Sequence, residues 1–369
     1  MPEDQNNIQT TGDQMFEHFR FVSDKGQALI RIDKYLAAHM VRTSRSRIQQ
    51  ALDAEYVMVN GKVVKSNYKV KPEDVITINF PYQRHVCVLA PEDIPLDIVY
   101  EDEDILLVNK PAGLVVHPGH GHYTGTLLNA LMFHLNIQAT SAQESISDNE
   151  QDSDDSDDSG SSDDGNLGLL VHRIDKDTSG LLVVAKNDQA QIKLAKQFFH
   201  HTIERKYVAI VWGNIEEDEG TVVGNIGRDP NDRLRFKVYS EESGIGKHAV
   251  THFRVLERFG YVTMVECRLE TGRTHQIRVH MNHIGHPLFN DERYGGSRIL
   301  KGTIYTKYKQ FVDNCFALLP RQALHAQTLG FIHPRTGEEM FFQVPLPSDM
   351  QALIDKWRKY AMQRTLEED

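Results

Sequence analysis

An acidic, serine-rich tract in the middle of the chain limits what the rest of it can fold into. Residues 138–166 carry ten Asp and Glu side chains, no Lys or Arg, and almost no apolar residue. Such a segment cannot bury enough surface to offset the entropy lost on ordering, so we expect it to be a disordered insertion. The chain must therefore build its cores from the residues before and after this tract.

The same tract explains the charge of the chain. The 369 residues hold 41 Lys and Arg against 52 Asp and Glu, a formal net charge of −11. Without the tract the balance is 41 against 42, so the remaining residues are almost neutral. The net charge therefore does not exclude a nucleic-acid partner, although phosphate binding depends on basic surface.

A calcium-binding loop is the alternative interpretation of this tract. Asp155, Asp157 and Gly160 have the spacing of two ligands and the glycine of such a loop. The twelfth position is Asn166, where a bidentate Glu is required. The missing ligand argues against calcium, and disorder remains the prediction.

Length, hydrophobicity and cysteine content predict a soluble cytoplasmic protein of at least two domains. A chain of 369 residues is long for one domain. The longest apolar runs, such as Leu181–Ala185, are far shorter than the ~18–20 residues that span a bilayer. Met1–Gln14 is polar and acidic and lacks the apolar core of a signal peptide, so we expect neither a secretory signal nor, given the short apolar runs, a membrane partner. Cys87, Cys267 and Cys315 form no CxxC pair, which indicates a reducing compartment without disulfides or zinc.

Residues 26–84 have the pattern of a small basic domain, preceded by a partly disordered leader at 1–25. Two helical patterns, which start near Arg31 and Thr43, are followed by Asn60-Gly61 between short apolar strands. Asn-Gly is the strongest two-residue signal for a β-hairpin. The segment holds ten Lys and Arg against five Asp and Glu. The basic side chains that we expect to contact RNA are Arg42, Arg45, Arg47 and Lys62.

This pattern resembles the alpha-L RNA-binding domain, a module that ribosomal and RNA-modifying proteins share. The alternative is a basic helix face that is simply exposed to solvent, which is the commoner meaning of such charges. Two helices followed by a basic hairpin favour RNA binding over that alternative.

Residues 94–347 form the larger predicted domain, which a linker at 81–93 precedes and a C-terminal helix at 348–369 follows. Its helices are expected at 124–136, 188–200 and 274–284, with a capping pattern at Asp188 and Gln191 and with Thr274 as a further cap. Its strands are expected at 105–109, 181–185, 205–212, 247–256 and 261–269. Strands follow one another without regular alternation with helices, which predicts an α+β fold.

The most informative stretch is His172-Arg173-Ile174-Asp175-Lys176-Asp177-Thr178-Ser179-Gly180, a polar loop between two apolar strands. Such a loop lets a rigid sheet present charged side chains in a cleft. A simple turn, in which Asp177, Thr178 and Ser179 satisfy backbone groups, explains the second half of the loop. That interpretation gives no reason for the His-Arg-x-Asp sequence before it.

Two further stretches contain candidate functional side chains. Arg205–Gly213 places Tyr207 at the head of a strand, where a tyrosine is more often part of the core. Leu269–His280 reads as a strand end, a glycine turn and a basic helix start. Its Arg273 and Arg278 can pair with a carboxylate or a phosphate.

Together these stretches resemble the RluA-type family of pseudouridine synthases. The matching motifs are VNKPAGLVVHPG (108–119), HRIDKDTSGLLVVAK, RKYVAIVWG, and LETGRTHQIRVHMNHIGHPLFND followed by YG. With the alpha-L domain in front, the chain is similar to the D-type branch, which implies action on large-subunit ribosomal RNA or its precursor particle. The resemblance also implies a mostly antiparallel mixed sheet flanked by helices, a monomer, and no cofactor.

The resemblance assigns roles to single residues. Asp175 matches the catalytic aspartate, and Arg278 matches the basic residue that pairs with it. Tyr207 matches the tyrosine that stacks on the target uracil and takes the proton from carbon 5. The remaining candidates bind or position the substrate: Arg173, which matches the arginine that fills the space left by the flipped base, and His172, Arg273 and His275.

These residue types suit the reaction. Pseudouridine formation breaks the bond between ribose C1′ and uracil N1, turns the base and rejoins it through C5, without redox change or loss of a group. A carboxylate can attack C1′ or stabilise positive charge there, and an arginine keeps Asp175 ionised. The competing carboxylate is Asp177, but its place in the Asp-Thr-Ser turn favours Asp175.

Two groups of histidines raise the question of a metal site: His117, His120 and His122, and His275, His280, His283 and His286. Neither has the i, i+4 pair with an intervening Glu of zinc hydrolases, and no cysteine accompanies them, so we expect no metal. Two other functions are compatible with the motifs. One is the same reaction on tRNA, and the other is a non-enzymatic ribosome-assembly factor that binds RNA.

Overall fold

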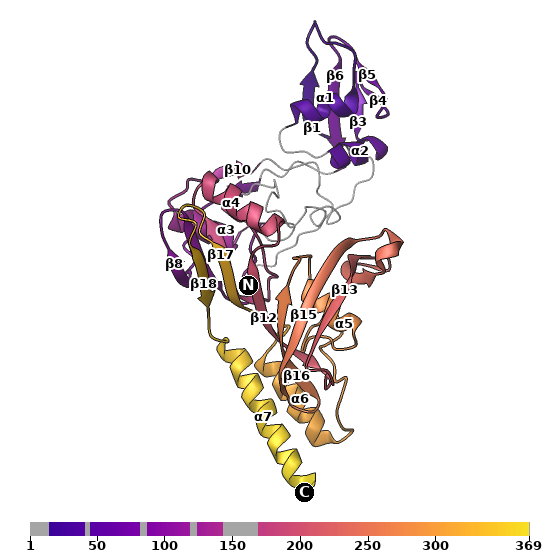
Figure 1. Ribbon diagram of the computed structural model, residues 1–369. Coiled ribbons are helices and arrows are strands. Elements are labelled where there is room, and N and C mark those ends of the chain that lie inside the picture. Colours follow the sequence, from indigo (N-terminus) through magenta and orange to yellow (C-terminus); the bar gives the residue numbers. More distant parts are fainter. Residues whose placement is uncertain (1–14, 41–44, 82–86, 119–123, 143–168, 369) are drawn as a thin grey trace, which may run out of the picture. The chain divides into compact units, whose positions relative to one another are not determined.

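The computed structural model describes residues 15–40, 45–81, 87–118, 124–142 and 169–368, and the chain divides into two compact units. The first contains the described residues up to Leu89 together with 139–142, and the second contains Ala90–Gln138 and the residues from 169 onward. In Figure 1 the elements between residues 15 and 80 are indigo to purple, and the C-terminal helix of the second unit is yellow. No described helix is both long and apolar enough to cross a membrane.

The first unit packs two helices against a small antiparallel sheet with the strand order β1-β6-β3-β4, and β2 pairs with β5 beside it. Ile32 and Ile48 of the helices and Ile76 of β6 are fully buried in its core. Asn60 and Gly61 have φ of 50° and 76°, as a type I′ turn requires, so the predicted hairpin is confirmed. The elements are β1 (Phe16–Val22), β2 (Ile30–Arg31), α1 (Ile32–His39), α2 (Arg45–Asp53), β3 (Val57–Val59), β4 (Lys62–Val63), β5 (Lys69–Val70) and β6 (Val75–Phe80).

The predicted leader is wrong from Phe16 onward. Strand β1 pairs with β6 in register from Phe16 opposite Phe80 to Val22 opposite Val75. A register shift between Glu17 and Phe19 interrupts the alternation of side chains, and this irregularity hides the strand from a period-two pattern. Residues 1–14 lie outside the described part of the chain.

The predicted linker and acidic tract also contain regular structure at their ends. Strand β7 (Cys87–Leu89) pairs antiparallel with β10 (Thr140–Ala142). The linker at 81–93 therefore includes a strand, and the insertion predicted to be disordered from residue 138 includes one as well. Residues 143–168, which hold all ten acidic side chains of the tract, lie outside the described residues.

The second unit is built on a sheet of ten strands, in the order β14-β13-β15-β16-β12-β17-β11-β9-β8 with β18 paired to β17. Every neighbouring pair is antiparallel except β11 and β17, so the predicted α+β class with a mostly antiparallel mixed sheet is confirmed. The strands are β8 (Ile98–Glu101), β9 (Ile105–Lys110), β11 (Ser179–Ala185), β12 (Glu204–Trp212), β13 (Glu219–Asp229), β14 (Asp232–Tyr239), β15 (Lys247–Arg258), β16 (Val262–Leu269), β17 (Leu324–Ile332) and β18 (Glu339–Gln343).

Helices cover two parts of this sheet with separate hydrophobic cores. The helices are α3 (Leu127–His134), α4 (Asp188–Phe199), α5 (Gln276–His283), α6 (Thr306–Leu318) and α7 (Ser348–Glu368). Leu194 and Phe198 of α4 pack with Leu181 of β11 and its neighbours. Trp357 of α7 and Val312 of α6 pack with β12 and β16, where Figure 1 draws the two helices side by side. Each Å² of apolar surface that these two cores remove from water stabilises the folded state by about 25 cal/mol.

Two predicted helix caps and one missing helix need correction. The cap of α4 is Asn187, whose side chain accepts the N–H of Ala190, rather than Asp188. Helix α5 starts at Gln276 after His275 in a left-handed conformation (φ 57°), so Thr274 is not its cap. Helix α6 was not predicted.

Candidate active site

The loop that carries Asp175 enters strand β11 and is held by side chains from other segments. Lys110, at the end of β9, is 1% exposed and donates from Nζ to the carbonyls of Pro111, Leu114 and Lys176, each at 2.8 Å. The N–H of Thr178 donates to the carbonyl of Asp175 at 3.1 Å and closes the turn. The backbone around Asp175 is thus fixed before any substrate is considered.

Gly180 allows the end of this loop to join two strands. It pairs with Lys110 of β9 on one side and with Ala326 of β17 on the other. Its φ is +115°, and a Cβ built there would lie 2.1 Å from the carbonyl oxygen of Ala326. Only glycine fits at this point, since any side chain would separate β11 from β17.

Asp175 forms an ion pair with Arg278 of helix α5. Nη1 of Arg278 lies 2.8 Å from Oδ2 of Asp175, whose side chain is 24% exposed. The edge of the guanidinium formed by Nε and Nη2 donates to Asp291, from Nε to Oδ2 at 2.7 Å and from Nη2 to Oδ1 at 2.9 Å. Asp291 is fully buried. The predicted partner of Asp175 is therefore in place, and a second carboxylate that we did not predict holds it there.

The pKa of Asp175 follows from these neighbours. Burial by itself would raise the pKa, but the positive charges of His275 and Arg278 and the hydrogen bond from Arg278 lower it to about 2. Burial also lowers the pKa of His275 to about 4, so that ring is neutral near pH 7 and Arg278 carries the effect there. Asp175 is a carboxylate at neutral pH, which suits attack on or stabilisation of an electron-poor carbon.

The ring of Tyr294 packs against the guanidinium of Arg278 in a cation–π contact, with 5.1 Å between Cζ of the arginine and the ring centroid. Its hydroxyl accepts the N–H of Phe236 at 3.2 Å and lies 2.9 Å from Nδ1 of His275. His275 is thereby oriented by Tyr294 close to Asp175, as a positioning role requires. Tyr294 belongs to the YG end of the motif, which was the available signal for it.

Tyr207 lies in β12, three residues after the first residue of that strand, and is 8% exposed. It is opposite Ala326 of β17, and Ala326 is opposite Gly180 of β11. Neighbouring strands are about 4.8 Å apart, so this register places the backbone of Tyr207 two strands, about 10 Å, from the end of the Asp175 loop. The sheet therefore brings Tyr207 to the same region as Asp175.

The structure gives His172 a different role from the substrate contact that we expected. Its Nε2 accepts the backbone N–H of Val183 at 3.0 Å, and its ring stacks on Phe198 with 4.5 Å between centroids. Burial, together with Arg205, lowers the pKa of His172 to about 3, which keeps the ring neutral as an acceptor. His172 fastens the loop to β11 and α4.

The other predicted substrate-binding residues are spread over both units. Arg173 is exposed beside Asp175 in the loop, and half-buried Arg273 donates from Nε to the carbonyl of His248 at 3.1 Å. In the first unit, Arg45 in α2 and Lys62 in β4 are exposed. Arg42 and the side chain of Arg47 lie outside the described residues.

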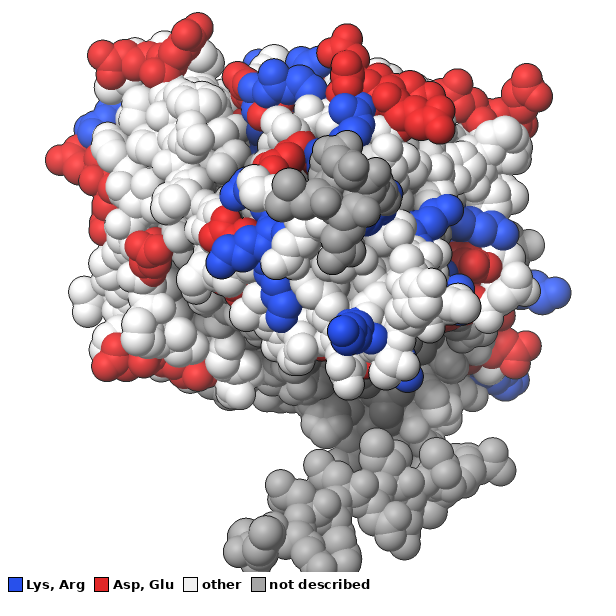
Figure 2. Space-filling model, turned by 90° about the horizontal axis from the view of Figure 1, so that it is seen from below, with Lys and Arg blue, Asp and Glu red and all other residues white. Residues whose placement is uncertain are grey.

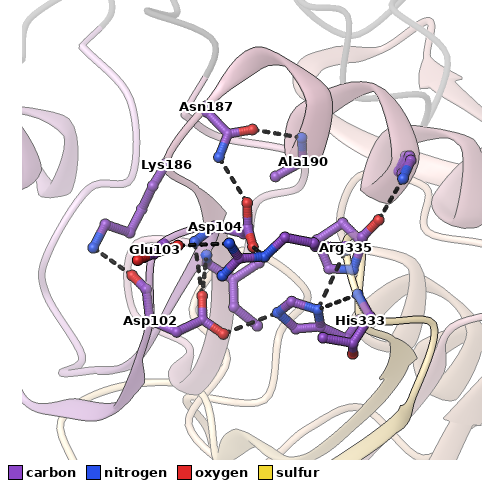
Figure 3. Close-up of polar contacts among 12 residues, drawn as sticks. Asp102, Glu103, Asp104, Lys186, Asn187, Ala190, His333 and Arg335 are labelled. Carbon is purple, nitrogen blue, oxygen red and sulfur yellow. Dashed lines mark hydrogen bonds and ion pairs between the residues drawn. The ribbon is translucent and has the colours of Figure 1, made fainter.

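A second polar cluster has carboxylates and a histidine close enough for a metal, but its own hydrogen bonds account for it. Asp102, Asp104 and His333 lie within reach of one ion (Figure 3). Nδ1 of His333 accepts the N–H groups of Arg335 and Thr336, so Nε2 carries the proton that it donates to Asp102 at 2.9 Å. Arg335 pairs with Asp104 at 2.6 Å. The imidazole has no lone pair left for a metal, and the cluster is a structural junction.

Comparison with known proteins agrees with this geometry. The chain matches the RNA pseudouridylate synthase family over residues 104–283 and the S4 domain family over residues 30–76. It is 47% identical to RNA pseudouridine synthase YlyB of Bacillus subtilis over 333 residues, which cover 89% of this chain and 94% of that protein. It is 41% identical to ribosomal large subunit pseudouridine synthase D of Zymomonas mobilis over 326 residues, which cover 88% and 92%.

The fold has a solved counterpart as well. Human RNA pseudouridylate synthase domain containing 4 superposes with a TM-score of 0.51 over 71% of this chain and 92% of that one, at 22% identity. The S4 match lies within the segment that resembles the alpha-L domain, and the larger match includes Asp175, Tyr207 and Arg278. The chain is therefore a member of the RNA pseudouridine synthase family, with an S4 domain ahead of its synthase domain.

Proposed function

We propose that this protein converts uridines of large-subunit ribosomal RNA to pseudouridine, with Asp175 as the catalytic carboxylate. The observation that carries the proposal is the charge pair between Asp175 and Arg278, which the buried Asp291 holds in place. Relatives named ribosomal large subunit pseudouridine synthase D, 40–42% identical over most of the chain, support the choice of RNA.

The chemistry needs one carboxylate that is ionised and partly accessible. Asp175 either attacks C1′ of the target nucleotide or stabilises positive charge there while the bond to N1 breaks. Uracil is kept, turned, and rejoined through C5, and C5 loses a proton while N1, released from ribose, gains one. The product is thus an isomer of the substrate, and the proposed reaction needs proton transfer and electrostatic stabilisation without any transfer of electrons.

The remaining side chains help the target base to leave its stack and orient it beside Asp175. The target uridine must leave its stack, which costs a few kcal/mol. Arg173, exposed in the loop, fills the vacated space, and Tyr207 stacks on the flipped uracil and takes the proton from C5. His275, oriented by Tyr294, and Arg273 position the nucleotide.

The S4 domain contributes affinity for the RNA backbone. Exposed Arg45 and Lys62, with Arg42 and Arg47, provide phosphate contacts, which position the RNA without reading its sequence.

The charge of the chain is compatible with an RNA substrate. In Figure 2 the face seen from below carries Lys and Arg side chains between groups of Asp and Glu, so a net charge of −11 does not make this face uniformly acidic. We further propose that the enzyme acts as a cytoplasmic monomer, on ribosomal RNA or its precursor particle, without metal or cofactor.

Mapping of pseudouridines in ribosomal and transfer RNA from a strain that lacks the gene tests the proposal. Loss of one or more sites in large-subunit RNA, restored by the wild-type gene and not by Asp175→Asn, is the expected result. Loss confined to tRNA would move the substrate to the alternative class. An unchanged map in both RNAs would refute the proposed substrate.

A further inference from the structure

The start of helix α7 is connected to the catalytic loop by one buried side chain. Arg321 is 8% exposed and donates from Nε and Nη2 to the two carboxylate oxygens of Asp349, at 2.8 and 3.0 Å. Its Nη1 donates to the carbonyl of Asp177 at 3.1 Å. A single guanidinium thus joins a carboxylate of α7 to the backbone two residues after Asp175.

The same guanidinium fastens the end of the loop to the start of β17. Nη1 also contacts the carbonyl of Leu324 at 3.2 Å, and Nη2 lies 3.5 Å from Oγ of Ser179. Ser179 in turn lies 2.9 Å from Nδ1 of His325. The second half of the loop is therefore held at two points, the carbonyl of Asp177 by Arg321 and the hydroxyl of Ser179 by Arg321 and His325.

Asp349 is a fixed point in this arrangement. It lies in the first turn of α7, where the helix dipole favours a negative charge, and its Oδ1 also accepts the N–H of Met350 at 2.7 Å. Met350, Leu353 and Trp357 anchor the helix with no exposure. Because the helix cannot follow a moving arginine, the position of Asp349 determines where the guanidinium lies.

We propose that Asp349 is a positioning residue for the synthase reaction: through Arg321 it holds the carbonyl of Asp177 and so fixes Asp175 against Arg278. This inference rests on the proposed catalytic role of Asp175. A buried arginine that loses its counter-ion keeps its charge, and such unpaired charges rearrange their surroundings. The hydrogen bond of Arg321 to the carbonyl of Asp177 is therefore expected to change when Asp349 is neutralised, and the loop that carries Asp175 moves with it.

Helix α7 offers a matched control. Arg358 donates from Nε and Nη2 to the two oxygens of Glu257 in β15, at 2.8 and 2.7 Å. The carboxylates of Glu257 and Asp349 are 32% and 31% exposed. Both pairs are bidentate, and both attach α7 to the rest of the second unit. The Arg358–Glu257 pair joins α7 to β15, however, and neither residue has a hydrogen bond to the loop among those of the described residues. Glu257→Gln therefore loosens the helix without releasing Asp177.

The test measures tritium release from ribosomal RNA labelled at uridine C5, with kcat and KM determined separately. Asp349→Asn should lower kcat at least tenfold with KM within twofold of wild type, and Asp349→Glu should recover part of the loss. Glu257→Gln should keep kcat within twofold. Wild-type kcat in Asp349→Asn, or an equal loss of kcat in Glu257→Gln, would overturn the proposal.

A second readout does not depend on activity. The amide of Thr178, which donates to the carbonyl of Asp175, should exchange its hydrogen faster in Asp349→Asn and at the wild-type rate in Glu257→Gln. If Asp349→Asn does not fold, Arg321→Lys serves instead, and it should give the same loss of kcat and faster exchange. Asp175→Asn in the same assay separates the two proposals. Activity in that variant would reject the role of Asp175, whereas its inactivity beside a fully active Asp349→Asn would reject the positioning role alone.

Discussion

Arg278 and Asp291 are joined by two parallel hydrogen bonds of 2.7 and 2.9 Å, and the carboxylate of Asp291 is completely buried. This leaves Nη1 of the arginine for Asp175. Asp291 therefore compensates the charge of Arg278 independently of Asp175. In the proposed reaction Asp291 would keep the arginine in place while the charge of Asp175 is taken up by C1′.

Replacement of Asp291 by Asn should be costly. It leaves the buried guanidinium with only Asp175 as a counter-ion, and removal of one partner of a buried pair costs about 3–5 kcal/mol. We expect urea unfolding to show a loss of this size and tritium release to fall with it. The control is Asp218→Asn, because Asp218 pairs with Arg258 at the surface and is 87% exposed. That variant should stay within about 0.5 kcal/mol of wild type, and equal stabilities for the two variants would contradict the role given to Asp291.

Asp175→Asn should abolish catalysis while the protein remains folded. Asparagine keeps the shape of the side chain but cannot attack C1′ or stabilise a cation there, so kcat should fall by about 10³-fold or more. Single-turnover tritium release measures the loss. Asp177→Asn is the matched control, since its backbone carbonyl rather than its side chain contacts Arg321. If Asp177→Asn were inactive and Asp175→Asn active, the catalytic carboxylate would be Asp177 and the role proposed for Asp175 would be wrong.

Stability should depend on the ionisation of Asp175 in acid. The pKa of this carboxyl is lowered from 3.8 to about 2 in the folded protein, so below pH ~4 the unfolded chain binds the proton first. The contribution is complete above the unfolded pKa and is lost as the pH falls towards 2. Its size is at most about 2.5 kcal/mol, from ~1.4 kcal/mol per pKa unit. Denaturation of wild type and Asp175→Asn between pH 5 and 2.5 should therefore converge as the pH falls, and parallel curves would contradict the lowered pKa.

Gly180→Ala tests the junction between β11 and β17. The new methyl group would lie 2.1 Å from the carbonyl oxygen of Ala326, in a backbone conformation with φ +115°. The strands must separate, so we expect the variant to unfold at a much lower temperature or not to fold. Gly337→Ala is the control, because its φ is +77° but no atom lies within 4 Å of the added carbon. That change should cost only the backbone term of about 1–2 kcal/mol, and similar melting temperatures for both would refute the steric explanation.

The pairing of Asp175 with Arg278 could be predicted from the sequence because both residues lie in motifs that resemble those of one family. The Asn60-Gly61 hairpin could be predicted because turn geometry is local. Helix α6 carried a readable signal in the buried Tyr308, Val312 and Cys315, at intervals of four and three residues. Strand β1 did not, because its register shift breaks the alternation that marks a strand.

The groups that hold the active site could not be predicted from the chain alone. Asp291 lies in a turn, where a carboxylate has many possible partners, and only the fold shows that Arg278 is among them. Arg321 precedes β17, and Asp349 lies in the first turn of α7, 28 residues later, so their contact depends on how the chain folds between them. His172 shows the opposite error, because a histidine in a catalytic motif suggested a substrate contact where the structure has a backbone acceptor.

The parallel pairing of β11 with β17 has a consequence for the timing of folding. Ser179 and His325 meet across 146 residues of chain, and ordering so long a segment is slow because closure entropy must be lost before the contact forms. During synthesis, Asp175 and Arg278 leave the ribosome before β17, Arg321 and Asp349 do. The loop that carries Asp175 should therefore reach its final conformation only after β17 and the start of α7 have been made and have folded onto it.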